Sequence, residues 1–399
     1  MRPLCSTVML FLTTLALVLQ TVSSLPTEQV PILRHATTNR NVSPALFSDL
    51  EELARIVDIS YCVGLTGTGV SKPFKCLSRC SDFPTFELVR TWNTGQLMSD
   101  SCGYIAVSHD EQNPRVVVAF RGTYSVANTI VDLSTKPQEY APYPGETDST
   151  NSAPRCANCT VHTGFYSSWN ITSPVIVPDI EAALAAYPGY QLTLVGHSLG
   201  GAVAALAGLE FVSRGWDPIV TTFGEPRIGN KALMHYIDSR FSNLNHAVVG
   251  DITSDVSMRY RRVTHIDDPV PLLPLSEWGY RMHAGEIYIT KSSLSPDITD
   301  LDICSGDEDP HCIAGQDASL AAVDEQRDQV ISLRDLSREA QQYNDEAEVV
   351  AQNWIPARYK LWQLFFAHRD YFWRLGLCVP GGDPWDWGRE RPLIEDGSA

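Results

Sequence analysis

The chain has 399 residues with 30 Lys or Arg against 47 Asp or Glu, which gives a net charge of −17 at pH 7. This length allows one large domain or two ordinary ones. The strongly negative charge argues against nucleic-acid binding and is typical of a soluble extracellular enzyme, so we expect no nucleic-acid partner.

The N-terminus has the pattern of a secretory signal peptide, which we place at residues 1–24. A short basic start precedes an apolar run at residues 8–19, and small residues follow the run. The run is too short for a comfortable membrane span, and no later stretch is long and apolar enough to make one. We therefore expect a secreted protein without a transmembrane segment. Residues 25–45, with several Pro, Thr and Asn, predict an extended leader.

Strands and helices alternate through the domain that we expect at residues 46–378. The predicted helices are residues 46–61, 125–133, 178–186 and 199–212. The predicted strands are residues 104–107, 116–120, 191–195, 219–223, 263–266 and 287–290, of which the first two form a hairpin. Residues 76–102 are predicted to be rich in loops. This alternation predicts an α/β domain with a largely parallel central sheet.

The last third of the chain changes in composition. Residues 297–348 hold 15 Asp or Glu against three Arg, a net charge of −12, and predict a solvated acidic surface insertion. Residues 361–378 are again apolar and aromatic. Residues 379–399 contain Gly381-Gly382 and Pro384 and predict a weakly ordered tail.

Nine cysteines remain beyond the signal peptide. In an exported chain they predict disulfides with one thiol left over. Three pairs are close enough in sequence to clip local loops: Cys76/Cys80, Cys156/Cys159 and Cys304/Cys312. Their spacings are not those of zinc sites, and we expect no metal.

Three glycosylation sequons begin at Asn41, Asn158 and Asn170. The Asn158 sequon contains Cys159, and a disulfide at that cysteine would disturb it. We therefore expect glycans at Asn41 and Asn170.

A Gly-x-Ser-x-Gly motif centred on Ser198 lies between the predicted strand 191–195 and the predicted helix 199–212. A strand that turns sharply into a helix crowds the residues beside the nucleophile, so Gly196 and Gly200 let the backbone pass. The serine oxygen then projects from the turn beside the amide donors of the helix N-terminus. The alternative is an ordinary tight turn of a doubly wound sheet, which gives no reason for a serine at this position.

A nucleophilic serine needs a base, and the base needs an orienting acid. In α/β-hydrolase architecture the acid follows the nucleophile at a strand end and the histidine comes last. Asp267 and Asp268 both end the strand 263–266. Downstream of them lie His283, His311 and His368. His311 sits in the acidic loop and is a poor base, and chain order favours His368 while leaving His283 open.

The oxyanion that forms when Ser198 attacks a carbonyl needs amide donors. The Leu199 N–H at the start of the helix is one candidate. The second is expected in a loop after an earlier strand, and Gly122-Thr123 lies in such a loop. The alternative for this segment is an ordinary strand-ending turn.

Several motifs together resemble one known family, the fungal class 3 triacylglycerol lipases related to the Rhizomucor and Thermomyces lipases. The matching motifs are Phe120-Arg121-Gly122-Thr123 with residues 125–133, His162-Thr163-Gly164-Phe165 with Ser168-Trp169, residues 196–201, residues 223–230, residues 264–274, and Ala367-His368 with Tyr371-Phe372. They cover roughly residues 46–290 and 361–378 in the family order. The resemblance implies an α/β-hydrolase fold with a helical lid.

The resemblance also assigns roles to residues. It selects Asp268 as the acid, because the family acid stands immediately before x-Val-Pro, and it selects His368 as the base. It implies oxyanion donors at Thr123 and Leu199. It makes the helix at residues 125–133 the lid, whose apolar side chains are Val126, Ile130, Val131 and Leu133. Thr129 stands where relatives usually carry tryptophan, and the acidic insertion has no counterpart in the shorter relatives.

The family disulfides carry over in the same way. They would join Cys62 to Cys378, Cys76 to Cys80, Cys156 to Cys159, and Cys304 to Cys312. Cys102 would then be the odd thiol.

The expected protein is a secreted serine carboxylester hydrolase, most simply a triacylglycerol lipase, that forms an acyl-enzyme on Ser198. It would act as a monomer at a lipid–water interface without a cofactor. One alternative is a feruloyl esterase or another soluble-ester hydrolase on the same fold. Another is a non-catalytic binding protein, which would normally have lost a member of the triad Ser198, Asp268 and His368.

Overall fold

A computed structural model describes residues 40–64, 69–95, 101–123, 137–143, 156–241, 258–316, 330–332, 354–356 and 367–386. The chain divides into two units, Met1–Thr38 and Asn39–Ala399, and all the described residues belong to the second. The predicted signal peptide, most of the leader and the predicted lid helix therefore lie outside the described residues. Within these ranges, no helix combines the length and apolar character that crossing a membrane requires.

An eight-stranded sheet forms the centre of the second unit, in the order β1-β2-β3-β6-β7-β9-β11-β12. Its strands are β1 (Phe86–Asn93), β2 (Cys102–Ser108), β3 (Arg115–Phe120), β6 (Gln191–His197), β7 (Ile219–Phe223), β9 (Tyr260–His265), β11 (Glu286–Ile289) and β12 (Leu301–Ile303). The five strands from β3 to β11 are parallel to their neighbours, and the flanking strands are antiparallel. The predicted hairpin and the predicted α/β fold with a largely parallel sheet are confirmed.

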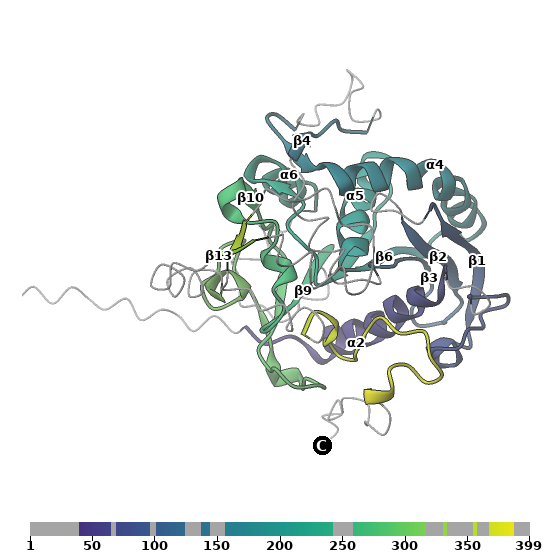
Figure 1. Cartoon of the computed structure of the whole chain (residues 1–399). Coiled ribbons are helices and arrows are strands. Elements are labelled where there is room, and N and C mark those ends of the chain that lie inside the picture. The colour runs from purple at the N-terminus through teal and green to yellow at the C-terminus, as the bar shows by residue number, and fades with distance from the viewer. Residues whose placement is uncertain are drawn as a thin grey trace, which may run out of the picture. The chain divides into compact units, whose positions relative to one another are not determined.

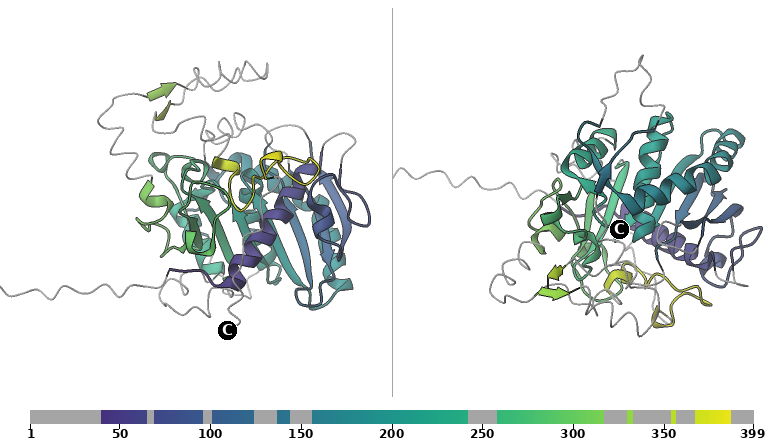
Figure 2. Two further views of the ribbon diagram at one scale, coloured as in Figure 1. Left: turned by 90° about the horizontal axis from the view of Figure 1, so that it is seen from below. Right: turned by 45° about the horizontal axis from the view of Figure 1, so that its top comes forward.

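Helices cover both faces of this sheet (Figure 1). The side chains of β3 alternate between the two faces: Val116 and Val118 pack in one core with α4 (Thr163–Ala186) and α5 (Leu199–Ser213), and Val117 packs in the other with α2 (Pro44–Ile59). Figure 2 shows α2 crossing the sheet on its own face. A strand buried on both faces is a nearly continuous apolar run, as residues 116–120 of β3 are, and the buried Arg115 at its start pairs with Asp49 and Glu52.

The helix α2 begins two residues earlier than predicted because its sequence supplies a cap. The Ser43 hydroxyl accepts a hydrogen bond from the Leu46 N–H at 3.1 Å, and Pro44 occupies the first turn. Its regular turns end at Ile59 and continue as the 3-10 turn η1 (Ser60–Cys62).

One prediction about elements was wrong, and another found a helix but missed where it starts. The region expected to be rich in loops contains the edge strand β1, whose alternation is interrupted by a register shift between Leu88 and Arg90. A bulge of this kind breaks the two-residue period that signals a strand. The helix predicted to start at residue 178 is the second half of α4, which runs through Pro174 and Pro178. Burial of its apolar side chains, including Trp169, outweighs the hydrogen bonds that the prolines remove.

Smaller elements complete the unit. A four-stranded sheet has the order β10-β8-β5-β4, and a two-stranded sheet pairs β13 with β14. Their bounds are β4 (Pro137–Glu139), β5 (Thr160–His162), β8 (Gly229–Asn230), β10 (Tyr280–Arg281), β13 (Val330–Ser332) and β14 (Trp354–Pro356). The helix α6 spans Lys231–Phe241, and 3-10 turns are η2 (Arg79–Asp82), η6 (Val270–Leu272), η7 (Ser276–Trp278), η8 (Ile298–Asp300), η9 (Ala367–Arg369) and η10 (Pro384–Asp386).

The first part of the predicted acidic insertion belongs to the main sheet. β12 pairs with β11 as its last strand. The end of the predicted leader attaches here, because Asn41 forms a bridge with Asp302 and the Arg40 guanidinium lies 2.8 Å from an oxygen of Asp309. The chain before α2 is therefore fixed to this edge of the sheet.

The predicted weakly ordered tail is held in place over residues 379–386. Asp383 accepts a hydrogen bond from Arg369 at 2.8 Å, and Asp386 accepts one from Arg79 at 3.1 Å. These ion pairs fix residues 383–386 beside the segment that carries His368. Residues 387–399 lie outside the described part.

Four disulfides join Cys62 to Cys378, Cys76 to Cys80, Cys156 to Cys159, and Cys304 to Cys312. These are the pairs that the family resemblance implies. Cys102, on β2, is buried and belongs to none of these disulfides, and its thiol donates to the Asn93 Oδ1 at 3.1 Å. Cys62–Cys378 spans 316 residues of sequence and ties the end of α2 to the C-terminal segment.

Candidate active site

Ser198 occupies the turn between β6 and α5 in a backbone conformation that few L-residues adopt, with φ 58° and ψ −130°. The turn is possible because glycines flank it. A Cβ on Gly196 would lie 2.3 Å from the Gly200 carbonyl oxygen, and a Cβ on Gly200 would lie 2.4 Å from the Phe120 carbonyl oxygen. Neither position has room for a side chain, so the close packing of the backbone requires both glycines of the Gly-x-Ser-x-Gly motif.

The candidate residues gather at the carboxyl ends of parallel strands. Ser198 follows β6, Asp268 follows β9, and Gly122 and Thr123 follow β3. The Ser198 N–H donates to the Phe223 carbonyl at the end of β7 at 2.9 Å. Open α/β sheets bind their ligands at this edge, so the topology brings together residues that lie far apart in the sequence.

Asp268 and His368 form a buried pair. The His368 Nδ1 lies 2.9 Å from one oxygen of Asp268 and 3.1 Å from the other. The same carboxylate accepts the Tyr371 hydroxyl at 2.5 Å and the Val270 N–H at 2.9 Å. Burial opposes ionisation, but these partners, His368 first, hold the pKa of Asp268 below its usual value. The aspartate is therefore a stable anion that fixes the histidine ring.

Two reactive atoms of the site are buried and unbonded. Within the described ranges, neither the Ser198 Oγ nor the His368 Nε2 has a hydrogen-bond partner. His368 is held next to the serine turn, because its ring stacks on the ring of His197 with 4.7 Å between centroids. With Nδ1 engaged by Asp268, Nε2 is the nitrogen available for proton transfer.

The loop after β3 lies directly against the serine. A Cβ on Gly122 would be 2.9 Å from the Ser198 Cβ. Leu199 is the first residue of α5, and the first N–H groups of a helix have no acceptor within it. The expected oxyanion donors, Thr123 and Leu199, therefore belong to segments that flank the nucleophile.

The alternative base, His283, has other partners. Its Nε2 lies 3.1 Å from an oxygen of the buried Glu225, and its Nδ1 lies 2.8 Å from the Ala284 carbonyl oxygen. Both ring nitrogens thus face acceptors away from Asp268. Asp267 is half-buried, and the carboxylate that contacts His368 is that of Asp268.

Three site residues were not predicted from the sequence: Tyr371, His197 and Tyr61. Tyr371 and His197 lie in the matching motifs, so the motifs marked their positions without indicating a role. Tyr61 had no signal of its own, because its contact with His197 joins residues 136 positions apart.

The remaining predicted site residues divide into two groups. The lid residues Val126, Ile130, Val131 and Leu133 lie outside the described residues. The sequon asparagines Asn41 and Asn170 are exposed, the second on α4. Their glycosylation remains a prediction.

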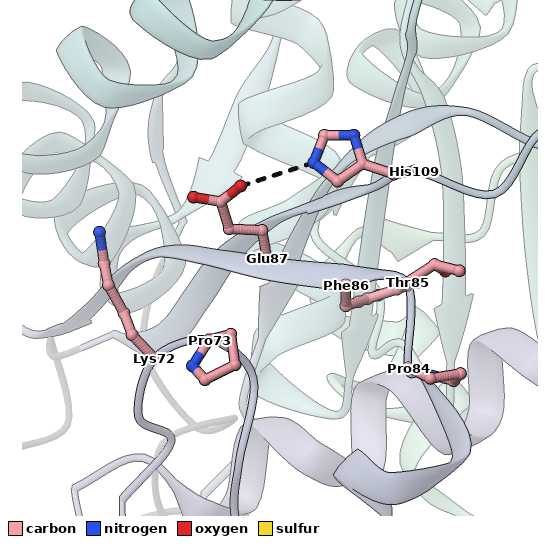
Figure 3. Close-up of a pocket in the computed structure, with 7 residues that line it drawn as sticks. All are labelled: Lys72, Pro73, Pro84, Thr85, Phe86, Glu87 and His109. Carbon is pink, nitrogen blue, oxygen red and sulfur yellow. Dashed lines mark ion pairs between the residues drawn. The ribbon is translucent and has the colours of Figure 1, made fainter.

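A hollow lies at the edge strand β1, with a volume of about 600 Å³ (Figure 3). Its lining residues are Lys72, Pro73, Pro84, Thr85, Phe86, Glu87 and His109. Glu87 and His109 approach to 3.5 Å; Glu87 is exposed to solvent and His109 is half-buried. No triad candidate lines this hollow, so it is separate from the site at the strand ends.

One cluster in the described part of the chain has the donor types of a metal site: Glu286, Cys304 and Cys312. The two cysteines are joined as a disulfide. They therefore have no thiolates to offer, and the cluster does not fit a metal ion.

A mostly parallel sheet with a serine at a strained strand–helix turn, beside a buried His–Asp pair, defines the class of α/β-fold serine hydrolases. A family model described as lipase (class 3) matches residues 117–278. The chain is 51% identical to the secreted mono- and diacylglycerol lipase 2 of Gibberella zeae over 374 residues, which are 89% of this chain and 88% of that protein. It is 52% identical to lipase A of Sodiomyces alcalophilus, with 90% and 88% covered.

The crystal structure of the Lip2 lipase of Yarrowia lipolytica is similar in fold, with a TM-score of 0.65 and 28% identity over 85% of this chain and 97% of that one. The chain thus belongs to the class 3 lipase family. It is a secreted lipase, a carboxylic ester hydrolase whose substrates are lipids.

Proposed function

We propose that the enzyme hydrolyses acylglycerols through an acyl-enzyme on Ser198. His368 takes the serine proton through Nε2 as the hydroxyl attacks the ester carbonyl, and then gives it to the departing alcohol. The N–H groups of Thr123 and Leu199 stabilise the tetrahedral oxyanion. Water, activated by the same histidine, then releases the fatty acid and restores the serine.

The observation that carries this proposal is the buried pair of His368 and Asp268. The aspartate fixes Nδ1 as the protonated nitrogen, which leaves Nε2 as the basic one, and it stabilises the imidazolium formed during each proton transfer. The pair lies beside a serine whose strained turn presents its oxygen. All these groups come from a single chain, so the proposal requires no metal, cofactor or second copy.

The substrate proposal rests on the relatives. The Gibberella zeae protein, similar over nine-tenths of the chain, is named for mono- and diacylglycerols. We therefore include partial glycerides among the substrates and treat triacylglycerol as the comparison. The helix expected at residues 125–133 is proposed as the lid over the acyl groove.

Initial rates on emulsified monoolein, diolein and triolein, beside methyl ferulate, test the proposal. The enzyme should hydrolyse one or more of the glycerides and have no comparable rate on the ferulate. Ser198→Ala, as the matched control, should have no rate above background on any of them. Ferulate hydrolysis that exceeds glyceride hydrolysis would assign the enzyme to the esterase alternative.

A further inference from the structure

A buried chain of hydrogen bonds runs behind the nucleophile. The Tyr61 hydroxyl lies 2.5 Å from the His197 Nδ1, and the His197 Nε2 lies 2.8 Å from the His368 carbonyl oxygen. The Gly122 backbone packs against the Tyr61 hydroxyl, since a Cβ on Gly122 would lie 2.5 Å from its oxygen. One path therefore joins the loop expected to hold the oxyanion, the residue before the nucleophile, and the backbone of the base.

The direction of these bonds follows from chemistry. A carbonyl oxygen can only accept, so the His197 Nε2 carries the hydrogen and Nδ1 accepts from the Tyr61 hydroxyl. Burial, and next the charge of His368, lower the pKa of His197 to about 3, so its ring is neutral near pH 7. Burial raises the pKa of Tyr61, so its hydroxyl remains a donor.

A neutral His197 is favourable here because its ring stacks on the ring of His368. His368 becomes positively charged each time it accepts the serine proton, and the rings of His197 and His368 stack at an interplanar angle of 29°. A second positive ring there would oppose the proton transfer, whereas a neutral ring does not. His197 can therefore support the base without competing for its proton.

Tyr61, where this chain of hydrogen bonds begins, is also linked covalently to the C-terminal segment that contains His368. Tyr61 stands in η1 next to Cys62, which is bridged to Cys378. The backbone of His368 is thus approached from two sides, by the disulfide along the chain and by His197 through its carbonyl. Both connections start from the same turn at the end of α2.

From this geometry we infer that Tyr61 and His197 are positioning residues for the hydrolysis. They hold the backbone of His368 and the Gly122-Thr123 loop in fixed relation to Ser198. The inference rests on the proposed function, because it acts through His368 as the base. It predicts that loss of either residue slows turnover without weakening substrate binding.

Kinetics on a soluble ester, p-nitrophenyl butyrate, test the inference in the full-length enzyme. Tyr61→Phe removes the hydroxyl, and His197→Gln exchanges the ring for a flexible amide. Each variant should lower kcat by roughly tenfold and leave KM within about twofold, because a buried donor or acceptor loses its partner while the acyl site is untouched. The double variant should be about as slow as the worse single one, since both interrupt the same path.

Tyr104→Phe is the matched control. Tyr104 is also fully buried, and its hydroxyl donates to the Ile56 carbonyl at 2.8 Å, away from the triad. Thermal unfolding should show a similar loss of stability for Tyr61→Phe and Tyr104→Phe, but only the first should lose kcat. Equal kcat losses in both would reduce Tyr61 to a general stabilising contact and overturn the inference.

A further comparison separates this inference from the proposed function. If His368→Ala is inactive while Tyr61→Phe and His197→Gln keep kcat within twofold of the wild type, the positioning role is wrong and the triad stands. If His368→Ala is active, the proposed function itself is wrong. If His197→Gln is folded and slow while His197→Ala is slower still, the partial rescue supports the hydrogen-bonded role.

Discussion

Single-residue variants test whether His368 or His283 is the general base for Ser198. Ser198→Ala and His368→Ala should each lower kcat by at least about a thousandfold, because triad members act as a unit and their effects do not add. His283→Ala should leave far more activity, since both its nitrogens are engaged by Glu225 and Ala284. The measurement is kcat/KM on a soluble ester for variants that unfold like the wild type. A His283→Ala enzyme as damaged as His368→Ala would exchange the two roles.

Tyr371→Phe tests the support of the acid. Its hydroxyl is one of the donors that keep the pKa of Asp268 low, so kcat should fall by roughly tenfold. A lowered pKa in the folded state contributes stability that is present above the unfolded pKa and is lost as pH falls. The variant should therefore lose more stability at pH 7 than at pH 3, as thermal unfolding at both would show.

Tyr260→Phe is the control for this change. Its hydroxyl donates to the buried Glu225 at 2.7 Å, which is also a tyrosine–carboxylate bond but lies outside the triad. It should lose stability with little change in kcat. Equal kcat losses in the two variants would show that Tyr371 has no special role.

The sequence predicted part of this site for identifiable reasons. Chain order and motifs indicated Ser198, Asp268 and His368, because the roles proposed for them depend on position relative to strand ends. Chain order alone left His283 as an alternative base, and only the fold shows that its ring contacts Glu225. The bond between Tyr61 and His197 joins residues 136 positions apart, and no local pattern encodes such a contact.

At the scale of elements, buried strands were the most predictable. The predicted strand 219–223 matches β7, and the predicted helix 199–212 matches α5 to within one residue. Their apolar runs are bounded by turn residues and follow one period. The failures were β1 and the first half of α4, where a bulge and two prolines interrupt the local pattern while tertiary packing maintains the element.

The lid prediction belongs to the same scale, and its residues 125–133 lie outside the described part. Val126, Ile130, Val131 and Leu133 should press onto the acyl groove, since burial of several hundred Å² at roughly 25 cal/mol per Å² favours closure by several kcal/mol. A lipid surface offers both apolar faces another partner and shifts the population toward the open state. Thr129 in place of tryptophan reduces the area, so interfacial activation should be moderate.

The variant Ile130→Ser with Val131→Ser should raise activity on soluble short esters relative to emulsions. The measurement is the rate against tributyrin concentration across its solubility limit. A smooth saturating curve without a rise at the limit, in both wild type and variant, would exclude a lid from the mechanism.

The segment that carries His368 also makes the fold sensitive to pH. Gly376 in this segment donates its N–H to Asp58 at 2.8 Å. Burial raises the pKa of Asp58 to about 6, against the opposing effect of Gly376 and Arg79. A raised pKa means that the folded state binds the proton more tightly, so this contribution to stability is full below about pH 4 and is lost as pH rises through 6.

Asp58→Asn removes that pH dependence. The difference in Tm between variant and wild type should therefore become more favourable to the variant from pH 4 to pH 7. The check is thermal unfolding at several pH values, with Asp179→Asn, a half-buried acid paired with Arg90, as the control. A difference that is constant across the range would contradict the account.

At the scale of the whole molecule, the disulfide Cys62–Cys378 joins the two ends of the hydrolase domain across 316 residues. Its removal by Cys62→Ser with Cys378→Ser should lower the free energy of unfolding by about 2–5 kcal/mol. Chemical denaturation measures this loss. Cys76→Ser with Cys80→Ser, which opens a bridge of only four residues' separation, should cost less, and the opposite order would contradict this reasoning.

The central claim is that Ser198 carries the acyl group and that His368 activates it. The most direct measurement is mass mapping of the full-length enzyme after reaction with a p-nitrophenyl alkylphosphonate, an ester mimic that remains on the nucleophile. The account predicts one modification per chain, on the peptide containing Ser198, no modification of that peptide in Ser198→Ala, and much slower labelling of His368→Ala. A label on another residue, or labelling of His368→Ala at the wild-type rate, would contradict it.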